Sequence, residues 1–286
     1  MRAAPIRLAT RRSELALAQA TIVADALGAV GIGVDLVLVT TDGDRDRSSP
    51  IAELTAGGAF VASLQVAVLD GRADAAVHSA KDLPVDGPAG LVVAAYPQRA
   101  APGDVLVGPA IADLAPGSRI GTGSPRRSAQ LAAIRPDLVT VPLRGNVDSR
   151  VSQVERGGLA GAVLAEAGLV RIGRHGAIGH RFPIEAMVPA PGQGALAVEA
   201  ERGSRAAETL AGIDDPQVRA AVEAERSVLA RTSLGCQAAL GVLATATGGG
   251  VRVWGFVADS AGPRRAVVAG TGWDDAAGRL HRELQL

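Results

Sequence analysis

The chain has 286 residues, 48% of them apolar and 2% aromatic, and its 29 acidic and 29 basic side chains cancel to a net charge of zero. This length predicts two or three domains, and the missing net positive charge argues against a protein that binds nucleic acid. The single cysteine, Cys236, excludes an intrachain disulfide and favours a reducing, cytoplasmic location.

No stretch of the sequence is typical of membrane insertion or secretion. The long apolar region from residue 15 to residue 40 is interrupted by Gln19, Asp25 and Asp35, a pattern that does not make a membrane span. Residues 1–5 lead into a strand-like run rather than into the apolar core of a signal peptide. We therefore expect no membrane partner.

The first part of the chain alternates between strand and helix patterns, which indicates an α/β domain. We expect a strand at 6–10, a helix capped by Ser13 and running to residue 30, a buried strand at 34–40, a polar loop at 41–59, a helix at 60–70 and a strand at 75–78. That last strand presents Ser79, Lys81 and Asp82 at its carboxyl end, where open α/β sheets bind ligands.

A second α/β unit begins near residue 99, and a third unit follows it. The second unit has strand patterns at 119–121, 138–143 and 160–165, and residues 189–194 then form a rigid segment that leads back to a strand of the first domain at 195–199. The third unit has helix patterns at 216–231 and 274–286 and strands at 239–246, 251–259 and 265–271. The sequence thus predicts two α/β lobes joined by hinge strands, residues 1–98 with 195–214 and residues 99–194, and a small α+β domain at 215–286.

Arginines recur at five predicted strand ends or loops, each beside Ser, Thr, Gly or Asn. They are Arg11 with Arg12, Arg126 with Arg127, Arg144, Arg150 and Arg171. Guanidinium groups bind carboxylates in a bidentate manner, and the turn at 122–127 suits an anion. If these loops converge on one cleft, they hold a ligand with many carboxylates; the alternative is that they are solvated surface cations.

Lys81 is the one lysine among the 29 basic residues, and Asp82 follows it directly. Because an ammonium is not interchangeable with a guanidinium, a lysine in a chain that otherwise uses arginine suggests that this position needs it. Asp82 is the best candidate for catalysis, since a carboxylate among cations stays ionised and can stabilise positive charge on a substrate. The alternative for Asp82 is a structural salt bridge or a helix cap.

Cys236 lies in a turn between a predicted helix and a predicted strand, beside Gly235. A solitary cysteine is often a small buried apolar residue, but a turn favours exposure and covalent reactivity. The four histidines show no metal-ligand spacing, so we predict no metal site.

Seven segments together resemble the porphobilinogen deaminase family, in the order of that family and over almost the whole chain. They are RLATRRS (7–13), HSAKDLP (78–84), GTGSPRR (121–127), LRGN (143–146) with Arg150, AGL (167–169) with Arg171, PGQGA (191–195) and GCQ (235–237). The resemblance implies two periplasmic-binding-protein-like α/β lobes and a C-terminal α+β domain. It implies an enzyme, hydroxymethylbilane synthase, that condenses four porphobilinogen molecules head to tail with release of ammonia.

The resemblance also implies a dipyrromethane cofactor, held by a thioether to Cys236, and a monomer whose substrate is porphobilinogen. Catalytic roles are implied for Asp82, Lys81 and Arg11. Contacts to the cofactor are implied for Ser79, Lys81, Asp82, Thr122, Ser124, Arg126, Arg127, Arg144, Gly145 and Arg150. Contacts to the substrate are implied for Arg11, Ser13, Phe60, Arg150, Arg171 and Gln193.

Three positions depart from the pattern of the family. Glu53 and Gly57 stand where the family often has two lysines, and Gly123 replaces a serine. The charged segment between the lobes is reduced at residues 99–104, so we expect fewer salt bridges at the hinge.

Two other functions remain possible from the sequence. A non-catalytic binding protein for a polycarboxylate needs the arginines but neither Cys236 nor Asp82. A cysteine hydrolase needs a histidine base, His175 or His180, within hydrogen-bond reach of Cys236.

Overall fold

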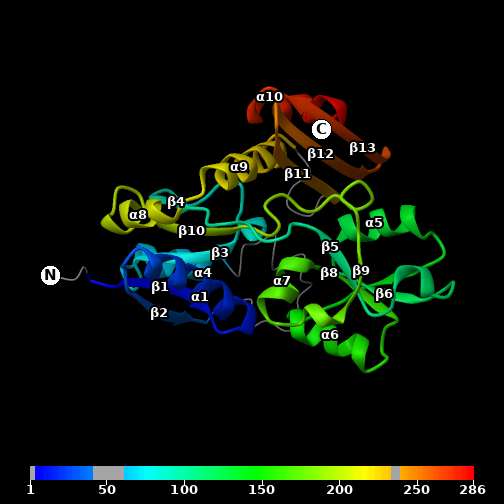
Figure 1. Ribbon diagram of the computed structural model, residues 1–286, viewed down its shortest axis with the longest axis horizontal. Coiled ribbons are helices and arrows are strands. Elements are labelled where there is room, and N and C mark those ends of the chain that lie inside the picture. Colours follow the sequence, from blue (N-terminus) through cyan, green and yellow to red (C-terminus); the bar gives the residue numbers. More distant parts are fainter. Residues whose placement is uncertain (1–3, 41–60, 233–238) are drawn as a thin grey trace. The chain divides into compact units, whose positions relative to one another are not determined.

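The computed structural model describes residues 4–40, 61–232 and 239–286, which fold into two compact units (Figure 1). Unit 1 consists of Met1–Arg99 and Ala195–Ala220, and unit 2 consists of Ala100–Gly194 and Ala221–Leu286. Three separate sheets lie within the described residues: one five-stranded sheet in unit 1, and one five-stranded and one three-stranded sheet in unit 2. The expected fold class, two α/β lobes with a small C-terminal sheet domain, is confirmed, while the predicted boundaries of three domains stay a prediction.

Unit 1 contains a mixed sheet in the order β2-β1-β3-β10-β4. Its strands are β1 (Ile6–Arg11), β2 (Val34–Val39), β3 (Ala75–Ser79), β4 (Leu91–Ala95) and β10 (Leu196–Glu201). β1 is parallel to β2 and β3, whereas β10 is antiparallel to both β3 and β4. The antiparallel strand is therefore the one that returns from unit 2.

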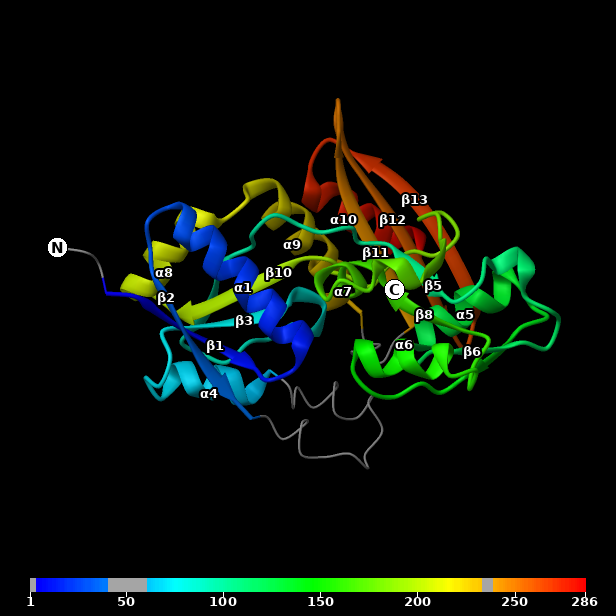
Figure 2. The ribbon, with the colours of Figure 1, turned by 60° about the horizontal axis from the view of Figure 1, so that its bottom comes forward.

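Helices cover both faces of this sheet (Figure 2). Among the described residues, the α-helices of unit 1 are α1 (Glu14–Ala29), α4 (Ala62–Leu69), α8 (Arg205–Leu210) and the first part of α9 (Pro216–Ala230). Val23 and Leu27 of α1 pack with Leu8, and Leu64 of α4 packs on the opposite face with Ala9. Alternate residues of β1 thus serve two cores, as the period of a strand requires.

The expected burial of the strand at 34–40 is wrong. β2 forms where expected, but Leu36 is 42% exposed and Leu38 is 43% exposed. Among the described strands β2 lies at the edge of the sheet, with β1 as its one neighbouring strand, and Val39 is its buried residue. The apolar run alone does not reveal whether a strand is central or at an edge.

The larger sheet of unit 2, in the order β7-β6-β8-β5-β9, has the same pattern of parallel and antiparallel strands as the sheet of unit 1, although its interior antiparallel strand comes first in the chain. Its strands are β5 (Asp104–Val107), β6 (Arg119–Gly121), β7 (Val139–Val141), β8 (Gly161–Ala165) and β9 (Ile178–Arg181). β6 is parallel to β7 and β8, and β5 is antiparallel to β8 and β9. α5 (Pro125–Ile134) packs on one face, and α6 (Val147–Glu155) and α7 (Glu166–Arg171) pack on the other.

The small sheet of unit 2 is an antiparallel meander of β11 (Ala239–Thr247), β12 (Gly250–Asp259) and β13 (Gly262–Gly270). α9 and α10 (Trp273–Glu283) share one apolar core with this sheet. Gly255 permits the close approach of α10, because a Cβ at this position would lie 2.6 Å from Cδ1 of both Leu280 and Leu284. No helix in the described ranges is long and apolar enough to cross a membrane.

Candidate active site

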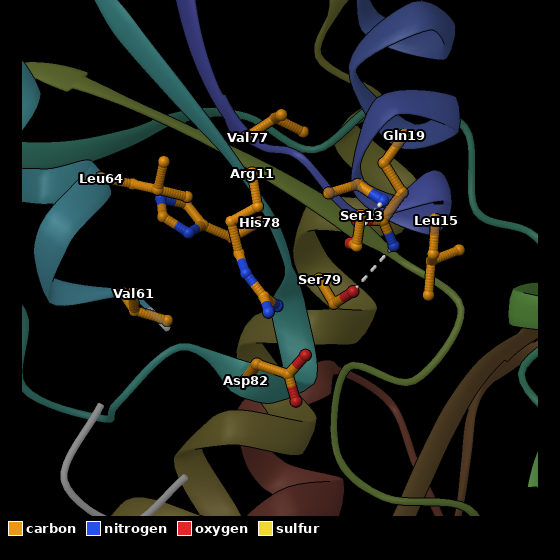
Figure 3. Close-up of a pocket in the computed structure, with 11 residues that line it drawn as sticks. Arg11, Ser13, Leu15, Gln19, Val61, Leu64, Val77, His78, Ser79 and Asp82 are labelled. Atoms are coloured by element: carbon orange, nitrogen blue, oxygen red, sulfur yellow. Dashed lines mark hydrogen bonds between the residues drawn. The ribbon is translucent and has the colours of Figure 1, made fainter. Parts of the chain in front are cut away.

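A pocket in unit 1 collects residues from the carboxyl ends of two adjacent parallel strands (Figure 3). β1 ends at Arg11 and leads to Ser13, the N-cap of α1, and β3 ends at Ser79 and leads to the 3₁₀ turn Ala80–Asp82. The pocket has a volume of about 90 Å³. Its polar residues are Arg11, Ser13, Gln19, His78, Ser79 and Asp82, and its apolar residues are Leu15, Ala16, Val61, Leu64 and Val77. This is the edge at which an open α/β sheet binds ligands.

Asp82 and Arg11 bring opposite charges to the pocket. Asp82 is exposed, and Figure 3 shows the guanidinium of Arg11 extending toward its carboxylate. Lys81 is exposed in the same turn but is not one of the residues that line this pocket. A carboxylate accepts hydrogen bonds and stabilises a cation, and a guanidinium binds a carboxylate. The pocket therefore suits a ligand that carries both N–H groups and a carboxylate.

Two serine hydroxyls and one amide add hydrogen-bonding groups. Ser13 Oγ accepts a hydrogen bond from the backbone N–H of Ala16 at 3.3 Å, and Ser79 Oγ accepts one from Gln19 Nε2 at 2.9 Å. We did not identify Gln19 as a site residue from the sequence. A signal existed, because Gln19 lies four and eight residues before Val23 and Leu27 on the buried stripe of α1.

A buried polar cluster adjoins the pocket through His78. Glu199 of β10 is 4% exposed, and its Oε2 accepts a hydrogen bond from Gln65 Nε2 of α4 at 2.9 Å. His78 Nε2 lies 3.1 Å from the same oxygen, without hydrogen-bond geometry. Because a buried carboxylate is costly without partners, these contacts tie α4 and β3 to β10. They connect the helix that supplies Leu64 to the strand that leads to Asp82.

In unit 2, Arg126 and Arg127 are buried and both pair with Asp104. They are 3% and 6% exposed, and Asp104 is fully buried. Arg126 Nη1 lies 2.6 Å from Asp104 Oδ2, and Arg127 Nη2 lies 2.7 Å from Asp104 Oδ1. Asp104 is the acidic residue that the segment 99–104 retains, and the expectation of fewer salt bridges at the hinge stays a prediction. Two guanidinium groups facing one carboxylate leave an excess of positive charge in this interior.

Gln193 belongs to the same cluster. It is 1% exposed, and its Nε2 donates to Asp104 Oδ1 at 2.9 Å and to the carbonyl of Pro102 at 2.7 Å. Burial alone would raise the pKa of Asp104, but the charges of Arg126 and Arg127 and the hydrogen bonds from Arg126 and Gln193 hold it well below its usual range. The cluster thus links β5, the start of α5 and the returning segment that holds Gln193.

Further predicted residues lie at the carboxyl ends of β6 and β7. Ser124 is the N-cap of α5, and Thr122 Oγ1 accepts the backbone N–H of Ser124 at 3.2 Å. Arg144 is exposed, and Arg150 Nε donates to the carbonyl of Gly145 at 2.8 Å. Gly145 has φ +102°, and a Cβ there would overlap Ser149 Oγ. Glycine is therefore required at this turn.

Arg171 is partly buried at the end of α7. Its Nη2 donates to the carbonyl of Gly194 at 2.7 Å, and its Nε has no hydrogen-bond partner among the described residues. Burial lowers the pKa of Arg171 to about 10, so the side chain remains a cation near neutral pH. A partly desolvated guanidinium with an unused N–H suits an anionic ligand.

The structure brings the predicted residues together in two groups. Arg11, Ser13, Ser79 and Asp82 share the pocket of unit 1, and Arg126, Arg127 and Gln193 share the buried cluster of unit 2. Phe60 and Cys236, with Glu53 and Gly57, lie outside the described residues. The predicted ligand contacts of all these residues stay predictions.

Solved structures share only a distant likeness with the chain. A lipoprotein from Ruminococcus gnavus has a TM-score of 0.45 and 13% identity, covering 76% of this chain and 93% of that structure. A periplasmic substrate-binding protein of an ABC transporter from Coxiella burnetii has a TM-score of 0.44 and 14% identity, covering 75% of this chain and 94% of that structure. The assignment of the family rests instead on the sequence relatives.

The sequence relatives are much closer. Porphobilinogen deaminase from Acidothermus cellulolyticus is 45% identical over 287 residues, covering 98% of this chain and 87% of the relative. Porphobilinogen deaminase 1 from Streptomyces coelicolor is 50% identical over 249 residues, covering 84% of this chain and 77% of the relative. The family model described as "Porphobilinogen deaminase, dipyromethane cofactor binding domain" matches residues 6–209. With these matches across both lobes, the chain belongs to the porphobilinogen deaminase family.

Proposed function

We propose that the pocket at the carboxyl ends of β1 and β3 holds the reacting porphobilinogen ring, with Asp82 as the catalytic carboxylate. As a member of its family, the protein is an enzyme that condenses four porphobilinogen molecules into linear hydroxymethylbilane on a covalently bound dipyrromethane primer. The observation that supports our proposal is the pairing, in one pocket, of an exposed carboxylate with Arg11 and serine hydroxyls. Porphobilinogen has the matching groups: a ring N–H, an aminomethyl cation and two carboxylates.

In the proposed reaction, Asp82 stabilises the positive charge that develops on the substrate. Loss of ammonia from the aminomethyl carbon leaves a cationic azafulvene, and the ring N–H lies next to that charge. The carboxylate of Asp82 would accept a hydrogen bond from the ring N–H and stabilise the cation as it forms. Arg11 and Ser13 would bind a substrate carboxylate and hold the ring in place, and this fixed orientation lowers the entropic part of the barrier.

The donor set of unit 2 fits the dipyrromethane cofactor. Its acetate and propionate groups complement the excess positive charge of Arg126 and Arg127 over Asp104. We assign Thr122, Ser124, Arg144, Gly145 and Arg150, which cluster at the ends of β6 and β7, to the same carboxylates. When bound, the cofactor supplies the free pyrrole carbon that attacks the substrate. Lys81 would also contact the cofactor, whereas Ser79, which lines the pocket, would contact the substrate ring. Arg171, Phe60 and Gln193 would serve the substrate, and Cys236 would be the attachment point.

Two measurements test this proposal. The intact mass of the purified protein should exceed the mass of the chain by two linked porphobilinogen-derived rings, and Cys236→Ser should lack this increment. In protein that carries the increment, Asp82→Asn should lower kcat by about 100-fold, in the range seen when one stabilising group is removed from an active site. Asp86→Asn, at an exposed position in the following loop, is the matched control. An Asp82→Asn enzyme with the kcat of the control would refute the catalytic role.

The monomeric state and the cytoplasmic location are also proposals. The lone cysteine supports a reducing compartment, and light scattering coupled to size-exclusion chromatography measures the molar mass in solution. A mass of 28.8 kDa plus the cofactor is the expected result, and twice this mass would contradict the monomer.

A further inference from the structure

Gln19 occupies a position where an apolar residue would serve the core better. It is 6% exposed, and Ala20, Val23 and Leu27 of the same helix are fully buried. Burial of an amide costs free energy unless its hydrogen bonds are replaced. The amide donates to Ser79 Oγ at 2.9 Å (Figure 3). This contact joins α1 to the strand that leads to Asp82.

The hydrogen bond restricts the direction of the Ser79 hydroxyl. A serine hydroxyl has one proton to donate and two lone pairs. Because one lone pair faces the Gln19 amide, the O–H bond must point elsewhere. In the part of the chain that the structure describes, Ser79 Oγ has no second hydrogen-bond partner, and Ser79 lines the pocket. The proton is thus available to an acceptor within the pocket.

Ser13 is arranged by the same principle. Its Oγ accepts the backbone N–H of Ala16 and keeps its own proton for another acceptor. With the guanidinium of Arg11, the residues that line the pocket therefore include three groups that can donate to a carboxylate. Asp82 lines the same pocket and is a hydrogen-bond acceptor.

We propose that Gln19 is a positioning residue that aims the Ser79 hydroxyl at a carboxylate of the bound pyrrole. The inference rests on the proposed function of the pocket and adds a residue that acts through Ser79 rather than on the ligand. It explains why an amide stands on the apolar stripe of α1. It also excludes a carboxylate at position 19, since that group would accept the Ser79 proton and repel the ligand.

The test is a double-mutant cycle with steady-state kinetics on cofactor-loaded protein, using Gln19→Leu, Ser79→Ala and the double variant. We expect each single substitution to raise the KM for porphobilinogen about tenfold, as for the loss of one hydrogen bond to a charged group, with kcat changed less than about twofold. The double variant should be no worse than Ser79→Ala. Gln217→Leu, at an exposed position on α9, is the matched control.

Thermal unfolding separates positioning from a structural role. Leucine fits the apolar stripe, so Gln19→Leu should unfold at the same midpoint as the wild type. If Gln19 were needed for folding, the midpoint of this variant would be lower. If Gln19→Leu does not fold, Gln19→Glu carries the test, and it should raise KM more than Ser79→Ala does. A Gln19→Glu enzyme with unchanged KM, or effects of Gln19→Leu and Ser79→Ala that multiply, would overturn the inference.

The failure of the proposed function gives a different result. If Ser79→Ala and Asp82→Asn both leave kcat and KM at the values of the control, the pocket does not bind the reacting ring. If those two variants are impaired and Gln19→Leu is not, the pocket stands and the positioning role of Gln19 is wrong.

Discussion

Burial separates the arginines of this chain into two kinds. Arg144 is exposed at a turn, whereas Arg126 and Arg127 lie in the interior of unit 2 with Asp104. The sequence predicted all of them as cations at strand ends, because each follows a strand pattern and has small polar neighbours. It did not predict their burial, since the counterion lies 22 residues before Arg126. Long-range pairing of this kind leaves no local pattern.

Asp104→Asn should destabilise the protein strongly. The substitution leaves two buried guanidinium groups facing a neutral amide, and breaking a buried ion pair in this way costs about 3–5 kcal/mol. Urea denaturation measures the free energy of unfolding, and Asp113→Asn, at an exposed position in unit 2, is the control. Equal stability of the two variants would show that the ion pairs contribute nothing net.

The contribution of Asp104 to the free energy of unfolding should depend on pH only in acidic solution. Its pKa is lowered in the folded state, so the unfolded chain, with an aspartate pKa of about 3.9, takes up the proton first as the pH falls. The stability that Asp104 adds is therefore complete above about pH 5 and decreases below about pH 4. The difference in unfolding free energy between wild type and Asp104→Asn, measured from pH 7 to pH 3.5, follows this contribution. A decrease between pH 7 and pH 5 would contradict it.

Most helices and strands could be predicted because they carry their own signals. Ser13 caps the helix that it was expected to cap, and Pro216 begins α9 as expected. We did not predict β4, β5, β9, α7 or α8. These elements have four to six residues, and such short segments rarely show a full period. Pairing with β10 and β8, rather than local pattern, defines β4 and β5.

Ser13 should have separable roles in the helix and in the pocket. As the N-cap of α1 it accepts the Ala16 N–H, and its loss in Ser13→Ala should cost about 1 kcal/mol of stability. Ser13→Asn should keep the cap, because asparagine caps helices as well as serine does, yet it lacks the hydroxyl. Urea denaturation and KM for porphobilinogen should thus diverge for Ser13→Asn. If Ser13→Asn has the KM of the wild type, the Ser13 hydroxyl does not bind the substrate.

Gly255 should control how α10 packs on the small sheet. A Cβ at residue 255 meets Leu280 and Leu284, so Gly255→Ala should destabilise the protein by about 1–3 kcal/mol through overpacking. Gly248→Ala is the control, because a Cβ at Gly248 has no heavy atom within 4 Å. Differential scanning calorimetry of both variants gives the comparison. Equal midpoints would mean that α10 shifts at no cost.

At the scale of the molecule, the sequence predicted the two lobes. It did not predict that their sheets share one pattern of parallel and antiparallel strands. The return of the chain to the first lobe was visible in the Pro- and Gly-rich residues 189–194, which precede β10. The shared pattern of strand directions was not visible, because it depends on β5 and β10 each pairing antiparallel inside a sheet. The placement of ligand residues at the ends of parallel strands follows from that shared pattern.

Cofactor attachment should stabilise the whole molecule. The excess positive charge at Arg126 and Arg127 destabilises the folded state, and the carboxylates of the cofactor should offset it. In addition, any ligand that binds only the folded state raises its stability. We expect Cys236→Ser, which lacks the attachment point, to unfold about 5 °C or more below the loaded wild type. An equal midpoint in calorimetry would show that the cofactor does not relieve this charge.

The central position of β10 also has a consequence for synthesis on the ribosome. β10 lies between β3 and β4, so the sheet that starts with Ile6 cannot close until residue 201 has left the exit tunnel. The larger sheet of unit 2 uses strands from Asp104 to Arg181 and becomes complete earlier. The lobe that is translated first is therefore completed second, and its early strands must wait with an open edge while the rest of the sheet is made.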